Sequence, residues 1–220
     1  MKAILFDFDG TLVDTQVLYN IAISKTLTPY NQKFTVEYCS QFFDGKCWND
    51  AFDILAIEEN FHKETIFNKG LTLAREIIAK HAKPTDGTPE TLALLKSKGV
   101  KMAICSNSHR DEIRAVLKQT GLDDFFDDAL IFGRDLVSKG KPSSDIYLLG
   151  LEAFGVAPQN AIAIEDSING ARASLNANIP TAIFTGSTSF HGMSSFKKAF
   201  QEDLPHFNNM KEIVQYVGHG

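Results

Sequence analysis

Five short apolar runs alternate with helix-like stretches along this chain, and this alternation restricts the fold more than any other feature. The runs are Ala3–Phe8, Val100–Cys105, Ala129–Phe132, Ala161–Ile164 and Thr181–Phe184. Short apolar runs that end at turns or polar clusters are typical of buried strands, and strands that alternate with helices form parallel sheets. The sequence therefore predicts an α/β fold, in which helices cover both faces of a parallel sheet.

The helices between these strands can be placed from the residues at their ends. The predicted helices are 88–98, His109–Thr120, Asp145–Phe154 and one that begins after Ser167. Thr88 is expected to cap the first of them, with Pro89 at its first position and Gly99 at its end. Ser167 is expected to cap the last.

Residues 15–82 interrupt the alternation, because a crossover between parallel strands normally needs only one helix. Apolar residues recur here at helical spacing; they are Val17, Leu18 and Ile21, and then Ile66, Phe67, Ala74, Ile77 and Ile78. The segment Lys83–Gly87 has the composition of a hinge. The sequence therefore predicts a core domain of residues 1–14 and 83–220, into which a helical domain of residues 15–82 is inserted.

The composition excludes several classes of protein. The chain has 220 residues, 44% of them hydrophobic, and a net charge of −5, which does not favour nucleic-acid binding. Its cysteines, Cys39, Cys47 and Cys105, form no CxxC pair, as expected for reduced thiols. Asp7 and Asp9 interrupt the first apolar run far short of a signal peptide or a membrane span. We expect a cytoplasmic protein without a membrane partner, and no protein partner is implied.

Two acids stand at the end of the first strand. Asp7 and Asp9 alternate with Phe8, so both carboxylates are expected on one side of the strand end, where open α/β sheets bind ligands. Gly10 allows a sharp turn there. Two unpaired carboxylates this close would repel each other, and a divalent cation would relieve the repulsion. Because carboxylate oxygens suit Mg²⁺, the sequence predicts a magnesium site.

The fourth strand also ends in paired acids, Glu165 and Asp166. If the first and fourth strands are neighbours in the sheet, Asp166 lies opposite Asp7 and Asp9. The predicted cation site would then join parts of the chain that are far apart in sequence.

Donors for an anionic substrate follow the remaining strands. Ser106 and Asn107 come after the second strand and offer hydrogen bonds. Lys141 lies between the third strand and its helix, where it could bind phosphate as a point charge. The sequence Gly140-Lys141-Pro142 is not a nucleotide P-loop, because Asp135 replaces the required glycine and Pro142 the Ser/Thr. The histidines show no zinc-ligand spacing.

These segments together resemble the haloacid dehalogenase superfamily, in the branch with a helical cap inserted after the first strand. The four motifs of that family appear in order as Asp7-Phe8-Asp9-Gly10-Thr11, Ser106, Lys141 and Glu165-Asp166-Ser167-Ile168-Asn169-Gly170. The resemblance covers residues 2–186. It implies a Rossmann-like, doubly wound core, an inserted helical cap, and phosphoryl transfer through an aspartyl phosphate.

The resemblance also implies roles for the acids. Asp7 would attack phosphorus, and Asp9 would protonate the leaving oxygen and then take a proton from water. Magnesium would be held by the Asp7 carboxylate, the Asp9 backbone carbonyl and Asp166, with Glu165 bound directly or through water.

The phosphate-binding residues implied by the resemblance are Ser106 and Lys141, with Asn107 assisting. In the cap, Lys46 and Trp48, beside Gly45, are candidates for substrate contact; a packed indole and a solvated lysine are the alternative interpretation.

The resemblance implies a phosphatase for a small phosphorylated metabolite, such as a sugar phosphate or a phosphoglycolate-like acid. Asp9 disfavours the family's dehalogenases, which lack an acid there. The alternative is a phosphomutase resembling beta-phosphoglucomutase, which carries a histidine near the position of Tyr19 and basic residues near those of Asp44 and Trp48. A non-catalytic protein that binds a phosphometabolite is the third hypothesis, and the complete motif set disfavours it.

Overall fold

The computed structural model describes residues 3–42, 63–187 and 192–218. The chain divides into two compact units. The first, here called the core unit, joins Met1–Asp14 to Lys83–Gly220, and the second, the insert unit, is Thr15–Ala82. The chain leaves and re-enters the core unit at adjacent points, because the Asp14 amide donates to the Lys83 carbonyl at 3.0 Å.

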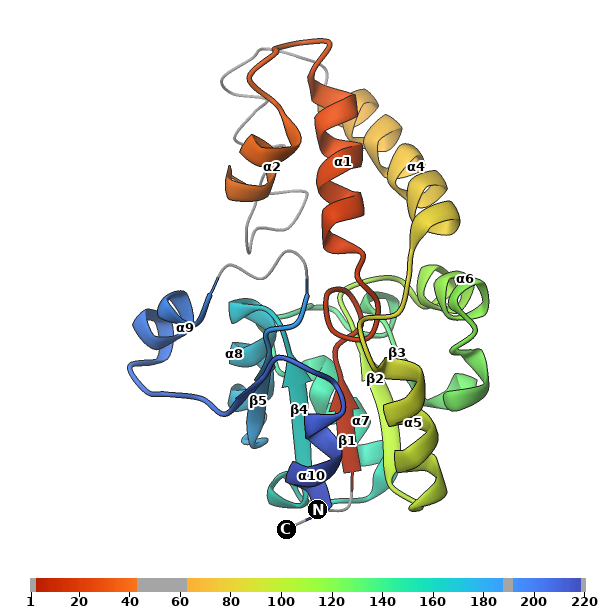
Figure 1. Cartoon of the computed structure of the whole chain (residues 1–220), viewed down its shortest axis with the longest axis vertical. Helices are drawn as coiled ribbons and strands as arrows, with labels where there is room; N and C mark the ends of the chain where they lie inside the picture. Colours follow the sequence, from red (N-terminus) through yellow and green to blue (C-terminus); the bar gives the residue numbers. More distant parts are fainter. Residues whose placement is uncertain (1–2, 43–62, 188–191, 219–220) are drawn as a thin grey trace. The chain divides into compact units, whose positions relative to one another are not determined.

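The core unit is built on a parallel sheet of six strands in the order β3-β2-β1-β4-β5-β6 (Figure 1). The strands are β1 Ala3–Phe6, β2 Lys101–Cys105, β3 Ile131–Phe132, β4 Ala161–Glu165, β5 Thr181–Phe184 and β6 His206–Phe207. Every residue of β1, β4 and β5 is buried, which explains why apolar side chains dominate these strands. The predicted α/β fold is confirmed, and β1 and β4 are neighbours.

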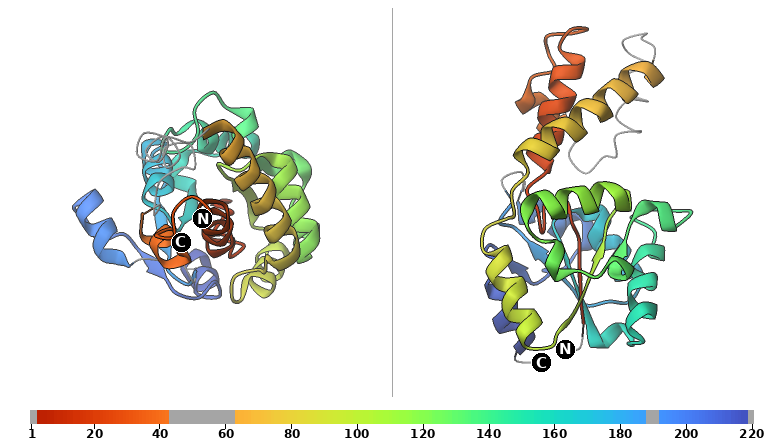
Figure 2. Two further views of the ribbon diagram at one scale, coloured as in Figure 1. Left: turned by 90° about the horizontal axis from the view of Figure 1, so that it is seen from above. Right: turned by 90° about the vertical axis from the view of Figure 1, so that its right-hand side faces the viewer.

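Helices cover both faces of this sheet. They are α5 Thr88–Ser97, α6 Arg110–Thr120, α7 Asp145–Phe154, α8 Ile168–Asn176, α9 Met193–Phe200 and α10 Glu212–Gly218. Side chains of α7 and α8 join one core cluster with β1, β2 and β4, while α5 and α10 pack together on the opposite face (Figure 2). Among the described residues, no helix is both long and apolar enough to cross a membrane.

The helix ends follow the signals in the sequence with one exception. Gly121 and Gly155 end α6 and α7 with positive φ angles of 71° and 59°, and Ser167 caps α8 by accepting a hydrogen bond from the Gly170 amide at 3.1 Å. The prediction that Thr88 caps α5 is wrong. The capping position is Gly87, at φ 79°, and Thr88 is the first helical residue.

Several predicted strand ends also need correction. β1 stops at Phe6 because the Phe8 carbonyl already accepts the amides of Leu12 and Val13 in a tight turn. β3 is only Ile131–Phe132, because the residues before it form a short 3-10 turn. After Gly186 the chain adds α9 and β6 to the elements expected from the sequence. No apolar run marks β6, a two-residue strand that follows a proline.

Each described element of the insert unit is a helix: α1 Gln16–Leu27, α2 Val36–Phe42 and α4 Lys63–His81. A small apolar cluster holds this unit together; its buried members are Ile23, Leu27, Phe34, Cys39 and Ile66. The Ser24 hydroxyl adds a buried hydrogen bond of 2.8 Å to the Phe34 carbonyl. The two sets of apolar residues that recur at helical spacing in the sequence lie in α1 and α4.

Candidate active site

The turn after β1 brings two distant parts of the core unit together. The Asp7 amide donates to the Ile164 carbonyl of β4 at 2.9 Å, which extends the pairing of the two strands to their ends. Gly10 then reverses the chain at φ 85°. A Cβ atom at Gly10 would overlap the Asp166 carboxylate. Glycine is therefore needed here both for its backbone angle and for the close approach of an acid.

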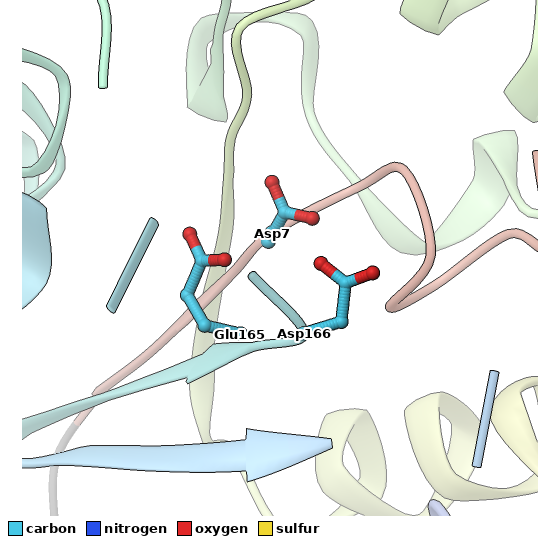
Figure 3. Close-up of side chains that lie close together, drawn as sticks. All are labelled: Asp7, Glu165 and Asp166. Carbon is cyan, nitrogen blue, oxygen red and sulfur yellow. The ribbon is translucent and has the colours of Figure 1, made fainter. Parts of the chain in front are cut away.

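Three carboxylates meet at the ends of β1 and β4 (Figure 3). Asp7, Glu165 and Asp166 each offer an oxygen, and these oxygens lie within 4.8 Å of one another. Asp7 is 6% exposed and Glu165 is fully buried, whereas Asp166 is half-buried. The adjacency of β1 and β4 thus brings Asp7 beside Asp166, as the sequence predicted. The Asp9 carboxylate, which was expected to face Asp166 as well, is not one of these three clustered acids; it accepts hydrogen bonds from serines after β2.

Lys141 is the cation of this cluster. Its ammonium donates to the Asp7 Oδ1 atom and to the Glu165 Oε1 atom, both at 2.5 Å, and its side chain is only 4% exposed. Burial alone would lower the pKa of Lys141, but the two carboxylates outweigh it and raise the pKa above its usual range. Lys141 therefore carries a positive charge beside the predicted nucleophile.

In this cluster of described residues, three acids face one lysine. Burial, together with the charge of Glu165, raises the pKa of Asp7 to about 7 in spite of Lys141. Burial and the neighbouring Asp7 raise the pKa of Asp166 well above its ordinary value. Clustered carboxylate oxygens with this excess of negative charge are a donor set that suits a hard divalent cation such as Mg²⁺.

Asn107 holds the backbone of Lys141 with both ends of its amide. The Lys141 amide donates to the Asn107 Oδ1 atom at 2.8 Å, and the Asn107 Nδ2 atom donates to the Lys141 carbonyl at 3.3 Å. A Cβ atom at Gly140 would overlap the Asn107 side chain, so the loop that carries Lys141 can lie this close to Asn107 only with glycine at position 140. The predicted phosphate-binding Asn107 is near the site, but its side chain contacts Lys141.

Ser106 and Ser108 contact the second acid of the first motif. The Asp9 Oδ2 atom accepts a hydrogen bond from Ser108 Oγ at 2.6 Å and a longer one from Ser106 Oγ at 3.3 Å. Sequence reasoning named Ser106 but missed Ser108. A signal was available, because residues two apart after a strand tend to face the same side.

Tyr147 is the second residue that sequence reasoning missed. It lies in the first turns of α7, is fully buried, and donates its hydroxyl to Glu165 Oε1 at 2.5 Å. Burial and the adjacent Glu165 raise the pKa of Tyr147 well above its ordinary value, so the hydroxyl stays protonated. Nothing in the local sequence marks this contact, because it depends on how α7 packs against the sheet.

Other predicted contacts are in or next to the insert unit. Lys46 and Trp48, with Gly45 and Asp44, lie outside the described residues. Tyr19, at the place of the mutase histidine, lies in α1.

Comparison with known proteins identifies the family. The sequence model described as haloacid dehalogenase-like hydrolase matches residues 4–184, which include every predicted site residue. The chain belongs to this hydrolase family. The resemblance inferred from the four motifs is therefore confirmed.

Relatives in the haloacid dehalogenase-like family include phosphatases. The chain is 32% identical over 186 residues to a phosphorylated carbohydrates phosphatase of Thermotoga maritima, covering 81% of this chain and 82% of that protein. It is 37% identical over 186 residues to a phosphoglycolate phosphatase of Thiobacillus denitrificans, covering 82% and 81%. The solved structure of a putative beta-phosphoglucomutase from Thermotoga maritima matches with a TM-score of 0.79 at 25% identity, covering 100% and 99%. The family and its named phosphatases support a phosphatase enzyme.

Proposed function

We propose that this protein is a magnesium-dependent phosphatase that removes phosphate from a small phosphorylated metabolite through an aspartyl phosphate on Asp7. One observation carries the proposal: a buried nucleophile candidate, Asp7, contacts the buried cation Lys141 inside a cluster of carboxylates. An acid, a fixed lysine and hard oxygen ligands are the parts that phosphoryl transfer through an aspartate requires.

In the first step, an Asp7 carboxylate oxygen forms a bond to phosphorus as the bond between phosphorus and the leaving oxygen breaks. Asp9 donates a proton to that oxygen, so an alcohol leaves. Asp9 is held for this task by Ser108 and Ser106 at the end of β2. In the second step, Asp9 accepts a proton from a water molecule whose oxygen attacks phosphorus, which releases inorganic phosphate and restores the Asp7 carboxylate.

The residues that would hold Mg²⁺ are the Asp7 and Asp166 carboxylates and the Asp9 backbone carbonyl. The bound ion would supply charge neutralisation for the phosphoryl oxygens. Glu165 would take part through water, because its Oε1 atom already accepts hydrogen bonds from Lys141 and Tyr147. Gly10 keeps Asp166 close to this position.

The phosphoryl oxygens would be held by Lys141 and Ser106. Lys141 stands beside the atom that attacks, so it can attract the anionic group toward Asp7. Asn107 would assist indirectly, because its side-chain amide fixes the Lys141 backbone. These three residues come from the loops after β2 and β3.

The relatives and the domain organisation support the proposed substrate class. Phosphatases of phosphorylated carbohydrates and of phosphoglycolate, both small molecules by name, are among the relatives. The insert unit would act as a cap that selects the leaving group. Free, buried Cys39 and Cys105 suit the cytoplasm, where we place the enzyme.

Hydrolysis of para-nitrophenyl phosphate tests the proposal directly. We expect turnover with Mg²⁺, loss of turnover after treatment with EDTA, and recovery when Mg²⁺ is added back. A panel of phosphorylated sugars and small phosphorylated acids then identifies the substrate. Full activity in the chelated, metal-free enzyme would contradict the magnesium assignment, and no turnover of any phosphate ester would contradict the proposal.

A phosphomutase is the second candidate, favoured by the match to the putative beta-phosphoglucomutase structure. Incubation with beta-glucose 1-phosphate separates the two functions. A phosphatase releases inorganic phosphate, whereas a mutase accumulates glucose 6-phosphate.

A further inference from the structure

Tyr147 contacts both the charged end of Lys141 and the acid that holds it. Its hydroxyl donates to Glu165 Oε1 at 2.5 Å, the same oxygen that accepts Lys141 Nζ at 2.5 Å. The Lys141 ammonium also lies 5.2 Å from the centre of the Tyr147 ring, a distance at which a cation is attracted to the ring face. Tyr147, Glu165 and Lys141 therefore form a closed triangle of contacts.

The hydroxyl of Tyr147 is not explained by packing. Tyr147 belongs to the apolar cluster between α7 and the sheet, with Ile146 and Leu151, and a phenylalanine would fill this place as well. Burying a hydroxyl is costly unless it finds a partner, and its partner here is Glu165. The choice of tyrosine is thus tied to the position of the Glu165 carboxylate.

The Glu165 carboxylate is fixed from several sides. Tyr147 donates to Oε1, Ser167 Oγ donates to Oε2 at 3.3 Å, and the start of α8 packs so closely that a Cβ atom at Gly170 would overlap the carboxyl group. A carboxylate held this way presents Oε1 to Lys141 in one direction. Lysine needs such a support, because its ammonium sits on a flexible stem of four carbons.

Lys141 has two carboxylate partners, but only one stays unchanged in the proposed reaction. Asp7 becomes an acyl phosphate in the first step, which removes the negative charge from the carboxylate oxygen that bonds phosphorus. Glu165 and Tyr147 take no part in bond making. They remain to hold the lysine when its contact with Asp7 changes.

We propose that Tyr147 is a positioning residue, which directs the Lys141 ammonium toward the phosphoryl site through Glu165 and through its own ring. This inference rests on the proposed function in giving Lys141 a phosphate to bind. The placement of Lys141 itself can be measured without any turnover.

Two variants separate the hydroxyl from the ring, and a third is the control. Tyr147→Phe removes only the hydroxyl, and Tyr147→Leu removes the ring as well. Ile146→Val, on the neighbouring buried residue of α7, trims the same core without touching Glu165 or Lys141. We expect Tyr147→Phe to raise both KM for para-nitrophenyl phosphate and the inhibition constant of inorganic phosphate, about three- to tenfold, the size of one ordinary net hydrogen bond, because the lost bond acts on phosphate only through Glu165 and Lys141. The value of kcat should change less, because the lysine binds phosphate throughout the reaction.

Chemical labelling of Lys141 gives the readout that needs no turnover. Acetic anhydride modifies free amines, and mass spectrometry reports the rate at each lysine. We expect Lys141 to react slowly in the wild type and in Ile146→Val, faster in Tyr147→Phe and fastest in Tyr147→Leu, relative to exposed lysines such as Lys98 in the same sample.

Two results would overturn the inference. One is an unchanged Lys141 labelling rate in both Tyr147 variants, and the other is a weakening of phosphate binding by Ile146→Val equal to that caused by Tyr147→Phe. If the wild type hydrolyses no phosphate ester while the labelling order holds, the proposed function fails and the positioning role of Tyr147 stands.

Discussion

The two units of this protein differ in how tightly their sequences are tied to chemistry. The predicted catalytic, phosphate-binding and metal-binding residues lie in the core unit, where parallel strands end at one edge and bring acids from distant parts of the chain together. The insert unit is held by a small apolar cluster around Phe34, and its described elements are helices. The core unit holds the candidate catalytic residues, whereas the described residues of the insert unit show apolar packing between helices.

The comparison teaches where each property can be changed. A parallel sheet places strand ends next to each other whatever the helices contain, so the reaction type is fixed by a few residues at those ends. In a unit of packed helices, the apolar residues must be kept, but most surface positions accept different side chains. We therefore expect substitutions of the acids at the strand ends of the core unit to abolish turnover, and substitutions in the insert unit to change stability or substrate choice.

The largest effect is expected at Asp7. The Asp7→Asn variant keeps the size of the side chain but removes the nucleophile, so kcat for para-nitrophenyl phosphate should fall about 10⁴-fold or more. The control is Asp86→Asn, an exposed acid of the core unit, which should leave kcat unchanged. Residual activity of Asp7→Asn above a few percent of the wild type would mean that another group attacks phosphorus.

A buried substitution in the insert unit tests the other half of the comparison. Phe34 is fully buried and packs edge-to-face with Tyr38, so Phe34→Ala should destabilise the insert unit by about 3–5 kcal/mol. Urea unfolding followed by circular dichroism should show an early transition for this unit and a late one unchanged from the wild type. Tyr30→Ala, at a side chain that is 50% exposed in the same unit, should shift neither transition.

Activity measurements on Phe34→Ala test whether the insert unit also affects substrate choice. If the insert unit selects the leaving group, the variant should lose kcat/KM for the preferred metabolite more than for para-nitrophenyl phosphate. An equal loss of kcat/KM for both substrates would show that the insert unit does not select the leaving group. A single unfolding transition, shifted as a whole, would show that the two units do not unfold separately.

The closeness of Asp7 and Asp166 could be predicted from the sequence because a simple rule connects these acids to the fold. Asp7, Asp9 and Asp166 stand directly after apolar runs, and parallel strands align such positions at one edge. The prediction required only that β1 and β4 be neighbours. Ser108 and Tyr147 were missed for different reasons: Ser108 had a usable spacing beside Ser106, whereas the Tyr147 contact depends on the docking of a helix.

Very short strands could not be predicted from the sequence either. β6 has two residues and follows Pro205, so neither its length nor its hydrophobicity distinguishes it from a loop; its pairing comes from the β5 edge, where the Thr185 amide donates to the Phe207 carbonyl at 2.7 Å. The contact between the Asn107 side chain and the Lys141 backbone could not be predicted from the sequence either. An amide beside a phosphate site has several partners within reach, and only the position of the Lys141 loop decides between them.

A middle-sized effect is expected at Asn107. The Asn107→Ala variant loses both hydrogen bonds to the Lys141 backbone, so kcat/KM should fall about tenfold, the sum of two modest hydrogen bonds. The matched control is Asn176→Ala. This variant removes an exposed hydrogen bond of 3.2 Å from the Asn176 side chain to the carbonyl of Pro142, the residue that follows Lys141. If the two variants lose activity equally, the Asn107 amide has no special part in holding Lys141.

The smallest effect concerns stability in a loop of the core unit. Burial alone would raise the pKa of Asp135, but hydrogen bonds from the Arg110 side chain and backbone lower it to about 2. The folded pKa lies below the unfolded one, so the pair stabilises the protein above about pH 4 and this contribution is lost as the pH falls toward 2. For a pair that is partly exposed, the gain at pH 7 should be about 1 kcal/mol or less.

Urea unfolding of Asp135→Asn across the pH range tests this pair. The free energy of unfolding of the variant should lie below that of the wild type at pH 7, and the difference should shrink as the pH falls below about 4, where the unfolded wild-type acid takes up a proton. Asp111→Asn, at a side chain that is 94% exposed beside Arg114, should show no such gap. A gap that stays constant down to pH 3 would mean that the Asp135 carboxylate stabilises this loop by its shape and not by its charge.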